Sequence, residues 1–202
     1  MKMPPSPIFQ TLYAILGRHS KMEDKQFEIE LLDIHWLEDT PEEIDLCAHG
    51  QVKVRIGNEI IVDRREKENH WTLSAMTVHL LRTVDNNHNP ENLVGEHLIP
   101  CCGHHIDHLE NSTEVHIQGC FTGINYWVQH TDQNVKLTTE SETEIVITKK
   151  EYENEVIDFV DKVEEFYKNS KPKQMPDDNY DRTGYELMWK EWKRRRTQID
   201  TK

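Results

Sequence analysis

Two long stretches of the chain alternate apolar and polar residues with a period of two, the pattern of half-buried β-strands. In the first stretch, residues 26–63, the apolar positions change parity near residues 31–32, which predicts a β-bulge. Alternation is also present at residues 44–48, and turns are expected at residues 49–50 and 57–58, where glycines occur. These features predict an antiparallel meander.

The second stretch, residues 96–148, consists of shorter alternating segments that are bounded by Gly, Asn, Asp and Ser. Strands joined by short turns favour antiparallel pairing, because parallel pairs need long crossover connections. The segments expected as strands are 97–102, 114–120, 124–130, 134–138 and 143–148.

Four other segments have apolar residues at the spacing of an amphipathic helix. The clearest is residues 149–168. Thr148 and Glu151 are expected to form a capping box at the start of this helix. The remaining three helices are expected at 6–17, 72–84 and about 183–196.

Taken together, the elements predict the α+β fold class, with a mainly antiparallel sheet covered by helices. The length of 202 residues fits a single domain, residues 1–202. Residues 170–180 are typical of a linker to the C-terminal helix, which combines an aromatic face with a basic end. Thr183 and Glu186 indicate a capping box at the start of that helix.

The charge of the chain bears on its partners. Lys and Arg number 24 against 37 Asp and Glu, which gives a net charge of −13. Such a surface repels nucleic acid and anionic membranes, and it attracts basic proteins. We therefore expect a basic protein partner, no membrane partner and no nucleic acid.

The cysteines and the first residues bear on the compartment. Four cysteines, at positions 47, 101, 102 and 120, are typical of a reduced cytoplasmic protein. The segment at 1–17 has no signal-peptide cleavage site and is too short to span a bilayer. We expect a cytoplasmic protein.

The stretch "IPCCGHHIDHLE" at 99–110 gathers the residue types that zinc prefers, thiolates and imidazoles. However, adjacent cysteines in a strand point to opposite faces, and a second closely spaced cysteine pair is absent. We therefore favour ordinary structure with no cofactor, and keep zinc as the alternative. The candidate metal ligands are Cys101, Cys102, His104, His108 and Cys120.

Motifs for catalysis are absent, since the chain has no GxSxG, HExxH, P-loop or GxGxxG pattern. The interpretation that we favour is therefore non-enzymatic. The alternative is a zinc-dependent enzyme or zinc-stabilised domain centred on residues 97–120, with Asp107 or Glu110 as a base. A third arrangement, Cys102 as a nucleophile beside His104, requires a geometry that spacing alone does not establish.

Three segments carry a resemblance: "GCFTGINYWVQH", "KKEYENEVIDFVDKVEEFYKNSKPK" and "GYELMWKEWKRRR". Over residues 95–196, the chain resembles small uncharacterised bacterial proteins of the Bacillus type and, loosely, immunity proteins of polymorphic toxin systems. The resemblance implies a non-enzymatic immunity protein or antitoxin that binds a basic toxin. It implies no catalytic residue.

Overall fold

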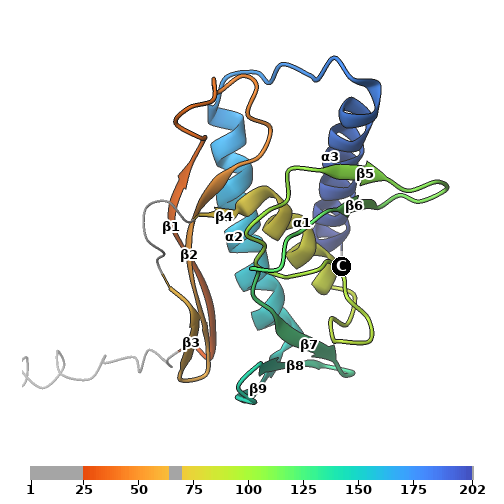
Figure 1. Cartoon of the computed structure of the whole chain (residues 1–202). Helices are drawn as coiled ribbons and strands as arrows, with labels where there is room; N and C mark the ends of the chain where they lie inside the picture. Colours follow the sequence, from red (N-terminus) through yellow and green to blue (C-terminus); the bar gives the residue numbers. More distant parts are fainter. Residues whose placement is uncertain (1–24, 64–69, 202) are drawn as a thin grey trace, which may run out of the picture.

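A computed structural model of the chain describes residues 25–63 and 70–201. Figure 1 shows their arrangement, with helices α1 and α2 between the sheet of β1, β2 and β3 and the C-terminal helix α3. In chain order the elements are β1 (Phe27–His35), β2 (His49–Ile56), β3 (Glu59–Val62), β4 (Trp71–Thr72), α1 (Leu73–Thr83), β5 (Ile106–His108), β6 (Val115–Ile117), β7 (Tyr126–His130), β8 (Asn134–Thr139), β9 (Glu144–Thr148), α2 (Lys149–Asn169) and α3 (Asn179–Asp200).

Every strand pairing between these elements is antiparallel, within the ranges that the structure describes. In the first sheet β2 is central, because β1, β3 and β4 all pair with it. The strands β5 and β6 form a two-stranded sheet, and β7, β8 and β9 form a third. The predicted α+β fold class with a mainly antiparallel sheet is confirmed.

Helix α1 lies at the centre of the core. All of its residues are buried, and it packs on both α2 and α3, as Figure 1 shows. Helix α2 packs on β1 with one apolar face, in which Phe159 and Val160 are fully buried. Its first turn carries the predicted capping box, with Glu151 N donating to Thr148 Oγ1 at 3.1 Å.

Two local predictions, the bulge near 31–32 and the turn at 57–58, are confirmed. The β1–β2 pairing shifts between Leu31 and Asp33, where the parity change predicted a bulge. Gly57 has φ of +57° in the turn between β2 and β3, a conformation that glycine adopts without the cost that a Cβ brings. The expected N-terminal helix at 6–17 lies outside the described residues.

Three predictions of local secondary structure are wrong. Residues 44–48 form loop and turn, and 49–50 lie within β2 instead of forming a turn. The close approach of Asp33 O explains the glycine at position 50, since a Cβ there would lie 2.1 Å from that oxygen. The segment 97–102 is not a strand and makes only an isolated bridge at Ile99.

The C-terminal helix begins earlier than predicted, at Asn179. Asp178 caps it, because its carboxylate accepts hydrogen bonds from the backbone N–H groups of Tyr180 and Asp181. Thr183, predicted as the cap, lies inside the helix and donates its hydroxyl to Asn179 O. An aspartate in the preceding linker therefore supplies the cap in place of the threonine.

A buried ion network joins α1, α3 and β6. Glu191 is fully buried and accepts hydrogen bonds from Arg82 at 2.7 and 2.8 Å and from Arg195 at 2.9 Å. It also accepts the backbone N–H of Val115 at 2.9 Å. Burial opposes ionisation of Glu191, but the bonds and charge of Arg82 outweigh it and hold its pKa below the usual value.

We predict that Glu191→Gln lowers the free energy of unfolding by about 3–5 kcal/mol, because it leaves two buried guanidinium groups without their shared carboxylate. Urea denaturation measures this change. The matched control is Arg196→Gln on the same helix, whose partners Asp161 and Asp200 are exposed, and there we expect about 1 kcal/mol or less. Equal losses in the two variants would contradict a dominant role for the network.

Candidate metal centre

Two chain segments run antiparallel beside the N-terminus of α1. At one end Ile99 and Ile124 exchange two backbone hydrogen bonds of 3.0 Å. At the other end Ile106 pairs with Ile117 in the β5–β6 sheet. The intervening segments, 100–105 and 118–123, have the same length, so the register is continuous across the gap. This register places Cys101 and Cys102 close to Cys120.

Contacts with the start of α1 hold the first segment in place. Thr72 donates its backbone N–H to Pro100 O at 3.0 Å and its hydroxyl to Cys101 O at 3.1 Å. Gly103 lies against Ala75 so closely that a Cβ would come 2.5 Å from the alanine methyl group. The cysteine pair is thus fixed by backbone contacts on a buried helix.

The three thiols form one cluster. The Sγ atoms of Cys101, Cys102 and Cys120 all lie within 4.8 Å of one another, each side chain is partly buried, and none is in a disulfide. A Zn–S bond of about 2.3 Å gives sulfur separations of about 3.8 Å in a tetrahedral site. Small side-chain movements would therefore bring all three sulfurs to one ion.

Protons are distributed unequally over the cluster. The hydroxyl of Thr122, 3.1 Å from Cys120 Sγ, lowers the pKa of Cys120 to about 7. The hydrogen bond with Cys120 raises the pKa of Cys102 to about 12. One thiolate, on Cys120, is therefore favoured near neutral pH, and the neighbouring thiol stabilises it by hydrogen bonding.

The structure brings together three of the five predicted ligands and leaves out the two histidines. His104 lies with its ring 5.0 Å from that of His49, and the ring of His108 lies 5.1 Å from that of Tyr180. The argument that adjacent cysteines diverge does not apply here. It assumed a strand, and residues 101–105 have none of the regular backbone of one.

The predicted bases lie in other surroundings. Asp107 accepts hydrogen bonds from Gln118 and Tyr180, each at 2.9 Å, which lower its pKa and tie β5 to α3 and to the residue that follows β6. Glu110 is exposed in the turn that follows β5. Neither carboxylate belongs to the thiol cluster.

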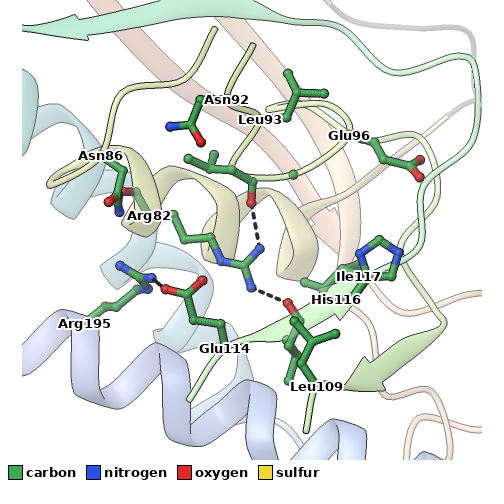
Figure 2. Close-up of a pocket in the computed structure, with 13 residues that line it drawn as sticks. Arg82, Asn86, Asn92, Leu93, Glu96, Leu109, Glu114, His116, Ile117 and Arg195 are labelled. Carbon is green, nitrogen blue, oxygen red and sulfur yellow. Dashed lines mark hydrogen bonds and ion pairs between the residues drawn. The ribbon is translucent and has the colours of Figure 1, made fainter. Parts of the chain in front are cut away.

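A second concave site lies over the ion network. Figure 2 shows this pocket of about 360 Å³, in which Arg82 projects between the segments that contain Leu93 and Leu109. Its guanidinium donates to the backbone oxygens of Val94 and Val115 as well as to Glu191. Because these donors are already engaged with the protein, the pocket is weaker than the thiols as a candidate site.

No family model, curated protein or solved structure matches the chain. Among the described residues, the helices lack the combination of length and apolar composition that crossing a bilayer requires.

We predict that Cys120 is alkylated by iodoacetamide before Cys102 and Cys47 at pH 7.5. With a pKa of about 7, roughly three quarters of Cys120 is thiolate at that pH, whereas burial raises the pKa of Cys47 to about 12. Peptide mass spectrometry over time gives the order of modification. Thr122→Val removes the hydroxyl and should slow Cys120 selectively; an unchanged rate would show that Thr122 does not activate this thiol.

Proposed function

We propose that the chain is a zinc-stabilised domain in which Cys101, Cys102 and Cys120 bind one Zn²⁺ ion. The observation that carries this proposal is the convergence of three thiols within 4.8 Å of one another. Thiolates are preferred zinc ligands, and three of them supply all but one position of a tetrahedral site. The fourth position would be taken by water or by a ligand from outside the cluster.

A structural role for the ion follows from where its ligands lie. Residues 100–105 and 118–123 are joined by backbone pairing only at their ends, at Ile99–Ile124 and towards β5–β6. An ion bound to Cys102 and Cys120 would join the two segments between those ends. Because binding requires deprotonated thiols and the folded arrangement, its free energy would add to folding stability.

The test of this proposal is zinc stoichiometry. Chelator-treated protein that is titrated with zinc should bind one equivalent through thiols, and at about 100 times Kd the unfolding free energy should rise by about 2.7 kcal/mol. Cys120→Ser should lose the part of this stabilisation that the thiol site contributes. Cys47→Ala, which removes a buried thiol outside the cluster, should retain it. Equal zinc stabilisation of wild type and Cys120→Ser would exclude the cysteine site.

A second proposed function rests on charge and is independent of the metal. We propose that the chain binds a basic protein, and that it is an immunity protein if that partner is a toxin. The net charge of −13 biases encounters toward cationic surfaces. A groove of about 620 Å³ between α2 and α3 provides a local site, lined by Asp161, Glu164, Glu165 and Asp200 together with Lys168 and Arg196.

The acidic groove predicts a salt-dependent association. With the basic product of a neighbouring gene as partner, the association rate should fall between about 50 and 500 mM salt, as the Debye length decreases from about 14 to about 4 Å. The double variant Glu164→Gln/Glu165→Gln should slow association more than the control Glu91→Gln/Glu140→Gln, which removes the same charge elsewhere. Equal slowing in the two double variants would show that net charge, and not the groove, sets the association rate. Salt-independent association would contradict electrostatic recognition altogether.

A further inference from the structure

Four histidines from separate parts of the chain meet at the end of the first sheet, where loop 36–48 begins. His35 on β1 is directly opposite His49 on β2, and their ring centroids lie 6.5 Å apart. His70 immediately precedes β4, and its ring lies 5.4 Å from His35 and 5.0 Å from His49. His104 lies two residues after Cys102, and its ring lies 5.0 Å from that of His49.

The central ring, His49, is buried without a hydrogen-bond partner. It is 1% exposed, and neither ring nitrogen makes a hydrogen bond. Its Nε2 lies 3.7 Å from Asp45 Oδ1, which is within ion-pair range but too far for a hydrogen bond. The Asp45 carboxylate instead accepts the backbone N–H groups of Leu37 and Cys47. An unsatisfied buried imidazole is costly to the fold, which points to a ligand for it.

The ring separations fit a shared metal ion. Zinc lies about 2.0–2.1 Å from an imidazole nitrogen, so two rings on one tetrahedral ion have centroids about 5.2 Å apart. Four of the six ring pairs are in contact, with separations from 5.0 to 6.5 Å that bracket this value, and His104 contacts His49 alone of the other three rings. Within the described residues only the cysteines already have three ligand atoms within 4.8 Å. Rotation of the imidazoles about χ2 is the movement that would make their nitrogens converge.

His35 already has the hydrogen bond that often orients a metal-binding histidine. Asp33 Oδ2 lies 2.9 Å from its Nδ1, and this hydrogen bond directs Nε2 away from Asp33 as the ligand atom.

An acidic groove gives cations access to two of these rings, His35 and His70. It has a volume of about 740 Å³, and His35 and His70 line it beside Asp33, Glu38 and Asp39. Carboxylates around a concave site raise the local concentration of divalent cations.

We infer that His35, His49, His70 and His104 form a second metal site, for a divalent ion of the type that imidazole prefers, such as Zn²⁺ or Ni²⁺. Its ligands differ in kind from the three thiols, and the inference does not depend on the zinc site proposed above. Imidazole donors suit zinc, copper and nickel, whereas clusters of thiolates select softer ions.

The test is metal titration of Cys101→Ser/Cys120→Ser, in which the thiol site is removed. Ni²⁺ titrated by calorimetry should bind at one equivalent, and Co²⁺ should give a visible spectrum without sulfur-to-cobalt charge-transfer bands. His70→Ala and His104→Ala, both at least partly exposed, should each weaken Ni²⁺ binding by about tenfold or more. His105→Ala and His116→Ala, which change histidines outside the cluster, should leave Ni²⁺ binding unchanged.

Circular dichroism establishes that each variant is folded. If the double cysteine variant fails to fold, the wild-type protein is titrated with Co²⁺, and a second equivalent without sulfur charge transfer, lost in His70→Ala, supports the site. Absence of that equivalent, or equal weakening in the His105→Ala control, overturns the inference. Failure of the thiol site would show separately, as a lack of sulfur-to-cobalt bands in the wild type.

Discussion

The structure depends most on the carboxylate of Glu191. A fully buried charge is tolerated only when hydrogen bonds and opposite charge replace its hydration, and here Arg82, Arg195 and the N–H of Val115 do so. Each partner belongs to a different part of the chain: Arg82 to α1, Arg195 to α3 itself and Val115 to β6. Such a network is weak evidence for high stability, but it specifies one arrangement of these elements, because any other would leave a charge unpaired.

The arrangement of elements that this network specifies also positions the thiol cluster. Val115 begins β6, and its pairing with His108 sets the β5–β6 register, which in turn places Cys120 beside the cysteine pair. Thr72 precedes the helix that carries Arg82, and its hydroxyl donates to Cys101 O instead of capping α1. The thiol cluster is therefore held from both ends of one buried helix.

The sequence contained much of the fold and little of the sites. Periodicity identified α2 with its Thr148 capping box, and a parity change located the bulge at 31–33, because both are local effects. The strand β5 was missed, since three residues show no periodicity. The thiol cluster was masked by an assumption: adjacent cysteines diverge in a strand, whereas residues 101–105 follow an irregular path fixed by Thr72 and Ala75.

The histidines illustrate what pattern reasoning cannot reach. Seven of the twelve fall between residues 88 and 130, so attention falls on that stretch, yet three of the four that converge lie before it. His35 faces His49 only because of the register that follows the bulge in β1. A one-residue slip would turn one ring to the other face of the sheet. The long-range register between β1 and β2 determines the histidine cluster, and the local spacing of residues does not reveal that register.

The two proposed sites are separated by a single residue of the main chain, Gly103, between Cys102 and His104. Its position against Ala75 leaves no space for a side chain, and its carbonyl lies 3.8 Å from the thiol of Cys47. Burial keeps Cys47 protonated, so this fourth thiol is a neighbour of the loop and does not compete for metal. Because α1 is buried throughout, Gly103 has a rigid support, and movement of the loop is limited to the residues on either side of it. An ion bound to Cys102 would therefore restrict the backbone that carries His104, and the reverse, so that the two sites are expected to influence each other's affinity.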